Sequence, residues 1–145
     1  MLLNFDVAVI EQDIQYVFRD KSLIRQAFSH SSFVNEMKTQ GNLSYERLEF
    51  VGEAVLELIT SEFLYEKYKD IPEGKLTKMR ASIVCEFTLS SVSKMLHYGD
   101  YVLLSKGEEL TGGRERNSIM CDLFESVLGA IYLDGGMEAA KRYVY

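Results

Sequence analysis

"YERLEFVGEAVLELI", residues 45–59, decides the fold because it predicts one helix with two opposite faces. An α-helix turns by about 100° per residue, so one side of this stretch is apolar and suited to burial against a core. That apolar stripe consists of Leu48, Val51, Val55, Leu58 and Ile59. The other side, within about 80°, carries Glu46, Glu49, Glu53 and Glu57. The pattern predicts a helix from Tyr45 to about Tyr68 with Ser44 as its cap.

Apolar periodicity along the rest of the chain predicts further helices, over residues 6–18, 21–28, 75–96, 118–133 and 137–145. In the helix over 75–96 we expect the inward side chains to be Leu76, Met79, Ile83, Val84 and Phe87. Segments 29–42 and 97–117 are expected to be irregular connectors. A single proline and ten glycines favour long helices over many short strands. The chain is therefore predicted to be one compact all-α domain over residues 1–145.

Composition narrows the classes of function. The net charge of -6 argues against a general nucleic-acid binder, because phosphate contacts are made by lysine and arginine. An acidic chain can still act on nucleic acid if its carboxylates hold a metal. The two cysteines are too few for a disulfide scaffold or a zinc site. No apolar run approaches the roughly 18 residues of a membrane span, so we expect a soluble cytoplasmic protein.

A second acidic pair suggests where the glutamate face points. Asp122 and Glu125 are three residues apart on one helix face, and Gly129 continues that face by one turn, where it would let another helix approach. If the two faces pack together, four carboxylates converge: Glu49, Glu53, Asp122 and Glu125. Such a group must protonate or bind cations, and oxygen ligands suit Mg2+ or Mn2+. The alternative is a solvated acidic face.

The sequence lacks the motifs of several other catalytic sites. His30 and His97 do not follow a glutamate at the spacing of a di-iron bundle, and neither a P-loop nor a serine-centred elbow is present. Mg2+ held by carboxylates acts mostly on phosphoryl groups, which predicts a metal-dependent phosphohydrolase. An all-α nucleoside triphosphate pyrophosphohydrolase, which also carries paired carboxylates on helices, is a remote alternative.

Phe50 lies beside the acidic stripe and away from the apolar one, at about 40° from Glu46. A neighbouring helix of the same chain could bury it. An aromatic residue outside the core and next to a metal site is better explained by contact with a second subunit or a substrate.

Four motifs in order resemble the ribonuclease III family. "ERLEFVGEAVLE" (46–57) resembles the family signature ERLEFLGDAVLE. "FRDKSLIRQAFSHSSF" (18–33) resembles its N-terminal segment, and "PEGKLTKMRASIV" (72–84) its EGxLxxLRAxLV helix. "GGRERNSIMCDLFESVLGAIYLDGG" (112–136) is similar to its second acidic motif.

The resemblance implies an all-helical endonuclease domain that cleaves double-stranded RNA as a symmetric homodimer, in rRNA and mRNA processing, and without a small-molecule cofactor. Metal sites would lie in a valley between subunits, and products would carry 5′-phosphate and 3′-hydroxyl ends. The implied Mg2+ ligands, with Mn2+ as a substitute, and catalytic carboxylates are Glu49, Glu53, Asp122 and Glu125. Glu46 and Glu73 match outer acidic positions of the family. Phe50 matches a residue that contacts the other subunit, and His30 matches a structural residue. The family's RNA-facing segment corresponds to the one that contains Lys106, Arg114 and Arg116. For these three cations, solvated loop charges are the alternative.

Two departures from the family pattern stand out. Glu53 replaces the signature aspartate and moves the carboxylate by about one methylene, which Mg2+ tolerates poorly. Glu53 is either a natural variant with a compensating shift or the cause of a dimer that binds duplex RNA and does not cut it. The second departure is length, because a basic double-stranded-RNA-binding domain follows position 145 in the common bacterial form. The resemblance thus implies truncation.

Overall fold

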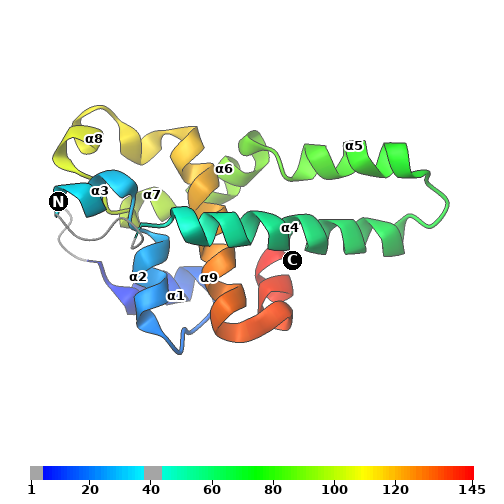
Figure 1. Ribbon diagram of the computed structural model, residues 1–145, viewed down its shortest axis with the longest axis horizontal. Helices are drawn as coiled ribbons and strands as arrows, with labels where there is room; N and C mark the ends of the chain where they lie inside the picture. The colour runs from blue at the N-terminus through cyan, green and yellow to red at the C-terminus, as the bar shows by residue number, and fades with distance from the viewer. Residues whose placement is uncertain (1–4, 38–43) are drawn as a thin grey trace.

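The structure is a computed structural model that describes residues 5–37 and 44–145. Within these ranges the elements are helical, apart from one isolated bridge between Ser29 and Leu103. They are α1 (Val7–Ile14), α2 (Lys21–Ala27), α3 (Ser31–Glu36), α4 (Glu46–Lys67), α5 (Glu73–Ile83), α6 (Glu86–Met95), α7 (Tyr98–Tyr101), α8 (Lys106–Leu110), η2 (Gly113–Glu115) and α9 (Asn117–Val144). Figure 1 shows α4 as the long horizontal helix and the first half of α9 crossing it. The predicted all-α fold is confirmed.

Two glycines allow α4 and α9 to cross with their backbones in contact. A Cβ atom added to Gly52 would lie 1.7 Å from the carbonyl oxygen of Glu125, and one added to Gly129 would lie 2.1 Å from the carbonyl oxygen of Leu48. Neither distance leaves room for a side chain. The close approach that Gly129 predicted is therefore present, and Gly52 is its counterpart on the other helix.

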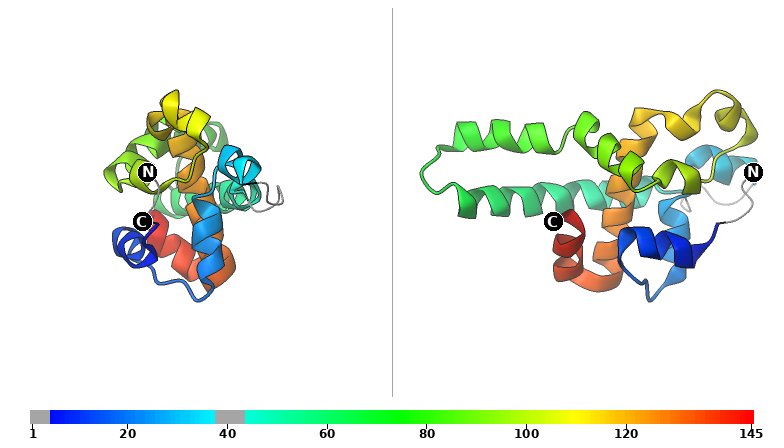
Figure 2. Two further views of the ribbon diagram at one scale, coloured as in Figure 1. Left: turned by 90° about the vertical axis from the view of Figure 1, so that its left-hand side faces the viewer. Right: turned by 180° about the vertical axis from the view of Figure 1, so that it is seen from behind.

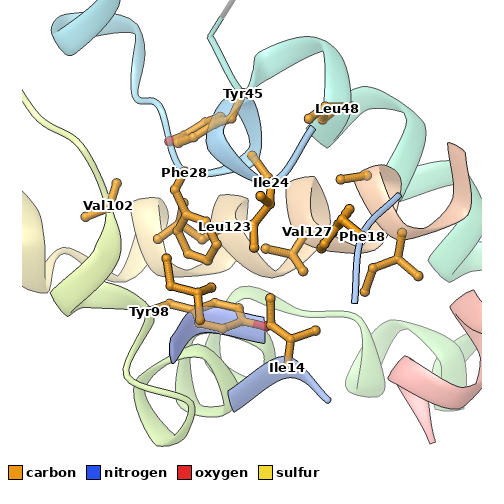
Figure 3. Close-up of a cluster of buried hydrophobic side chains, with 14 of the residues drawn as sticks. Ile14, Phe18, Ile24, Phe28, Tyr45, Leu48, Tyr98, Val102, Leu123 and Val127 are labelled. Atoms are coloured by element: carbon orange, nitrogen blue, oxygen red, sulfur yellow. The ribbon is translucent and has the colours of Figure 1, made fainter. Parts of the chain in front are cut away.

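The core lies around this crossing in two clusters. The larger one joins α1, α2, α7 and the first half of α9, and Figure 3 shows several of its side chains, including Phe28, Tyr98 and Leu123. The smaller one joins α4, α6 and α9 through residues such as Ile59, Leu89 and Leu128. The crossing is thus packed from both sides, which fixes the position of the helix faces that meet there.

The second half of α4 and all of α5 form a hairpin that projects from the rest of the molecule (Figures 1 and 2). We call this hairpin, residues 58–83, the arm. Every residue of α5 is at least partly exposed. Leu58, predicted to face the core, is 57% exposed because it lies at the edge of the apolar stripe and borders the hollow beside α5, while the next residue, Ile59, is fully buried.

The helix predicted over 75–96 is wrong as a single element, since α5 and α6 are separated at Val84 and Cys85. The carbonyl oxygen of Ser82 accepts hydrogen bonds from the Cys85 thiol and the Thr88 hydroxyl, which satisfy it as the helix ends. Phe87 is 77% exposed, and Ile83 is also exposed, so neither points inward as predicted.

The predicted connectors contain more helix than expected. Segment 29–37 includes α3, whose first turn is capped by the His30 Nδ1 atom accepting from the Ser32 amide. Residues 38–42 of that predicted connector lie outside the described residues. Segment 97–116 is folded into α7, α8 and η2. Short helical turns of this kind carry too few periodic positions to be recognised from sequence.

The ends of the remaining helices follow from local backbone geometry. α1 stops at Gln15, which has a left-handed φ of 64°, and is therefore shorter than the predicted 6–18. α9 is bent at Gly136, where φ is 87°, so the two helices predicted over 118–133 and 137–145 form one kinked element. Within residues 5–37 and 44–145, no helix combines the length and apolar composition needed to cross a membrane.

Candidate metal centre

Three carboxylates meet where α4 crosses α9. Glu49 comes from the first turn of α4, and Asp122 and Glu125 come from α9. Each offers one carboxylate oxygen, and these oxygens all lie within 4.8 Å of one another. The two glycines bring the helix backbones close enough for the side chains to share this space. Three carboxylates are an oxygen-only donor set of the kind that hard divalent cations prefer.

The site is too buried for its charges to be solvated independently. Glu125 is 8% exposed, and burial, followed by the charges of Glu53 and Asp122, raises its pKa to about 7. Burial also raises the pKa of Glu49 to about 8, with a hydrogen bond and charge repulsion from Asp122 adding to the effect. The alternative of a solvated acidic face is therefore wrong for Glu125, which is buried, while Glu49 is only partly exposed.

Asp122 is held at the centre of a hydrogen-bonded group. Burial raises its pKa, while hydrogen bonds with Glu49 and Tyr45 act in the opposite direction. Without a cation, burial and the nearby charge of Asp122 raise the pKa of Glu49 and favour a proton on its carboxyl, which is hydrogen-bonded to Asp122. A divalent cation would replace that proton and relieve the repulsion among the three groups.

Glu53 lies at the rim of this centre. It is exposed, and its oxygens are outside the group of three. Its charge still reaches the site, because it contributes to the raised pKa values of Glu49 and Glu125. The predicted convergence of four carboxylates is therefore reduced to three, with the fourth nearby.

The two outer acidic positions lie in different surroundings. Glu46 is exposed in the first turn of α4, near enough for its charge to act on His30 and Tyr45. Glu73 begins α5 and lines a surface hollow with Tyr65 at the far end of the arm. Glu49 and Tyr65 are about 24 Å apart at 1.5 Å per residue, so the fold does not bring Glu73 to the carboxylates of its own chain.

Phe50 follows Glu49 directly and is 78% exposed. The alternative that another helix of the same chain buries it is therefore wrong. An aromatic ring standing free beside the site is consistent with the predicted contact to a second molecule.

The three predicted RNA-facing cations differ in how firmly contacts within the chain hold their side chains. Arg114 makes a bidentate ion pair with Glu109 and donates to the carbonyl oxygens of Gly99 and Val102, so it holds the 97–116 segment together. Arg116 pairs with Glu108 at 2.6 Å and is more exposed. Lys106 is exposed at the start of α8.

Two contributors to the site were absent from the sequence-based prediction. The Tyr45 hydroxyl donates to Asp122 Oδ2 at 3.1 Å, and the charge of Glu86 raises the pKa of Asp122. Tyr45 could be noticed only as the residue before an acidic helix, because its partner lies 77 positions away. Glu86 begins a helix that the sequence did not separate from α5.

Comparison with known proteins gives consistent results. A family model described as ribonuclease-III-like matches residues 20–145. Ribonuclease 3 of Enterococcus faecalis is 56% identical over 128 residues, covering 88% of this chain and 56% of that protein. Ribonuclease 3 of Halalkalibacterium halodurans is 52% identical over 131 residues, covering 90% of this chain and 50% of that protein. The chain thus spans about half the length of these curated relatives.

Among solved structures, the nuclease domain of ribonuclease III from Campylobacter jejuni superposes with a TM-score of 0.88 at 39% identity, covering 95% of this chain and 92% of that one. Dicer from Pichia stipitis gives a TM-score of 0.59 at 27% identity, covering 83% of this chain and 48% of that one. Since the family model spans most of the chain and the nuclease-domain fold coincides, this chain belongs to the ribonuclease III family.

Proposed function

We propose that this chain is the endonuclease domain of an Mg2+-dependent enzyme that hydrolyses phosphodiesters of double-stranded RNA and leaves 5′-phosphate and 3′-hydroxyl ends. The observation that carries the proposal is the group of three carboxylates at the α4–α9 crossing, in a chain whose relatives are named ribonuclease 3. The proposed cellular role is processing of rRNA and mRNA in the cytoplasm.

The residues that would hold Mg2+, or Mn2+ in its place, are Glu49, Asp122 and Glu125, with Glu53 reaching in from the rim. The chemistry that a divalent cation supplies in such a site is activation of water and neutralisation of charge on phosphoryl oxygens. The chain's own part is to hold the oxygens in place and keep the site partly dry. Burial strengthens the electrostatic attraction between these carboxylates and a cation.

The active form is proposed to be a homodimer. Between the two helices of the arm lies a hollow of about 460 Å³ whose lining includes Leu58, Leu76 and Arg80. We assign Phe50 of a second copy to this hollow, because the ring is exposed and apolar walls are available to it. A region involved in dimer formation has been described for the Campylobacter jejuni nuclease domain.

This arrangement also accounts for Glu73. Glu73 lines the hollow that would receive the other subunit's phenylalanine, and Phe50 is the residue next to Glu49. In the dimer, Glu73 would therefore stand near the carboxylates of the other copy. Glu46 and Glu73 would then act at the same site from different subunits, on substrate or on water.

RNA is proposed to be recognised through its backbone and 2′-hydroxyls more than through its sequence. Lys106 and Arg116 are the cations with exposed side chains in the predicted RNA-facing segment, and Arg116 would exchange Glu108 for a phosphate. Arg114 contributes mainly by shaping the segment. With a net charge of -6 per chain, binding is expected to weaken steeply as salt rises.

The direct test is incubation of the chain with long duplex RNA over a series of Mg2+ and Mn2+ concentrations. Short duplex products that Glu125→Gln fails to form are the expected result. Intact RNA at every metal and salt concentration would contradict the proposed activity.

A second candidate is a dimer that binds duplex RNA without cutting it. The specific observation in its favour is that Glu53 is exposed and outside the group of three. Glu53→Asp separates the two candidates, since a large gain in cleavage supports an impaired chain and an unchanged rate supports an active natural variant. Release of pyrophosphate from free nucleoside triphosphates would revive the remote alternative.

A further inference from the structure

Tyr45 is the one buried hydroxyl seen to bond the carboxylate centre among the described residues. Its hydroxyl donates to Asp122 Oδ2 at 3.1 Å, and the whole residue is only 2% exposed. A tyrosine hydroxyl is protonated near neutral pH and a carboxylate oxygen can only accept, so Tyr45 is the donor of this bond. The bond therefore acts on one chosen oxygen of Asp122.

The ring of Tyr45 is held on several sides. Its backbone amide donates to the carbonyl oxygen of Ser29 at 2.9 Å, and its ring meets His30 edge to face with centroids 5.7 Å apart. His30 is itself fixed, since its amide donates to the carbonyl oxygen of Leu103. Tyr45 also belongs to the larger core cluster, where Figure 3 shows it. A hydroxyl on so constrained a ring has little freedom to follow a moving partner.

We propose that Tyr45 is a positioning residue that fixes Asp122 so that this carboxylate offers a single oxygen, Oδ1, to the divalent cation. The proposal deepens the proposed function and rests on it, because it assumes that Asp122 holds metal. Oδ2 is engaged by the tyrosine, which opposes binding through both oxygens at once.

Binding through one oxygen has a consequence for which ion fits. Mg2+ and Mn2+ sites favour octahedral oxygen geometry, whereas Ca2+ accepts six to eight oxygens and readily takes a carboxylate in bidentate fashion. Partners that orient a metal ligand are typically worth about 10- to 100-fold in metal affinity. Tyr45 should therefore favour binding of the smaller ions over Ca2+. Its loss should narrow the difference in affinity between those ions and Ca2+.

The test measures metal binding directly, without RNA. Mn2+ binding is followed by the loss of the free-ion paramagnetic resonance signal, and Ca2+ binding by titration calorimetry, for wild type, Tyr45→Phe and Tyr98→Phe. Tyr98→Phe is the matched control, because its buried hydroxyl bonds Tyr143 at 2.6 Å in the core. Tyr45→Phe should weaken Mn2+ binding by about 10-fold and Ca2+ binding by less, and the control should change neither.

The outcomes distinguish a failure of the role proposed for Tyr45 from a failure of the proposed metal site. If wild type and Glu125→Gln bind Mn2+ equally poorly, the proposed metal site is wrong. If wild type binds Mn2+ and Tyr45→Phe binds it equally well, only the role of Tyr45 is overturned. If Tyr45→Phe weakens Mn2+ binding and Ca2+ binding by the same factor, the role of Tyr45 is also overturned, since a partly unfolded variant would lose affinity for both ions equally. Far-UV circular dichroism checks that Tyr45→Phe, which keeps the ring, retains its helices.

Discussion

The α4–α9 crossing and the arm use the same helix in opposite ways. At the crossing, α4 lies backbone to backbone against α9, and carboxylates are forced together in a buried site. Along the arm, one side of α4 still packs on the core through Ile59, whereas side chains on its other side, such as Leu58 and Tyr65, are exposed beside α5. The difference teaches that buried carboxylates are concentrated where the metal would bind, whereas the surface free for a partner lies one or more turns away on the same helix.

The largest effect is expected from filling the crossing. In Gly52→Ala, the new methyl group would meet the Glu125 carbonyl oxygen at 1.7 Å, so the helices must move apart. We expect a loss of about 3 kcal/mol or more in the free energy of unfolding, measured by urea denaturation at fixed chain concentration.

Gly74→Ala on α5 is the matched control, because nothing lies within 4 Å of its added Cβ atom. It should leave stability unchanged or raise it by up to about 1 kcal/mol through helix propensity. Equal losses at the two glycines would mean that the crossing is no tighter than the arm.

The next effect concerns pH. In the metal-free protein the pKa of Glu125 is raised from 4.5 to about 7, mainly by burial, so the folded state binds more protons than the unfolded state between those values. The free energy of unfolding should therefore fall as pH rises from about 4.5 to 7, by on the order of 2–3 kcal/mol for Glu125 alone. The raised pKa of Glu49 should extend the decline to about pH 8.

Mg2+ should flatten this decline, because it binds the deprotonated carboxylates and stabilises the folded state. Thermal or urea denaturation across the pH range, with EDTA or with Mg2+, is the measurement. Glu125→Gln removes one of the two carboxyls with a raised pKa and should reduce the slope in EDTA, leaving the part due to Glu49. The same slope in all three samples would show that burial at the crossing does not control stability.

The sequence was most informative where a helix interacts through its own periodic face. It identified the two faces of α4 and the close approach at Gly129, and these led to Glu49, Asp122 and Glu125. It could not indicate that Leu58 is exposed while the next residue, Ile59, is buried, because periodicity does not say how wide the covered face of a helix is. The helix break at Val84 and Cys85 is accompanied by a hydrogen bond from the Thr88 hydroxyl to the Ser82 carbonyl oxygen, which leaves no signal in the apolar periodicity. The Tyr45–Asp122 bond joins segments 77 residues apart, which local patterns do not encode.

A smaller effect is expected from the exposed ring beside the site. Phe50→Ala should weaken self-association by about 2 kcal/mol, or roughly thirtyfold in the dissociation constant, while far-UV circular dichroism stays unchanged. Sedimentation velocity over a dilution series measures it. Leu110→Ala, on α8 and equally exposed, serves as the control and should not alter association. A Phe50→Ala protein that associates as wild type does would remove the arm hollow as the receiving surface.

The smallest effect is expected within the arm itself. Arg80 joins α5 to α4 through Glu57, at 3.0 Å from Nε, and through the Ser61 hydroxyl, at 2.9 Å from Nη1. Both charged side chains are partly exposed, so the pair should contribute less than about 1 kcal/mol, decreasing with salt. Arg80→Met should therefore barely change global unfolding in urea.

Local opening should respond more than global stability does, because α5 has little burial to hold it in place. Hydrogen exchange is expected to speed up in residues 73–83 and to stay unchanged in 117–131, where α9 crosses α4. Lys141→Met, which breaks an ion pair between α9 and Glu62 of α4, is the control and should leave exchange in 73–83 unaltered. Faster exchange at the crossing as well would mean that the arm and the metal centre open as one unit, and the contrast between the two regions would not hold.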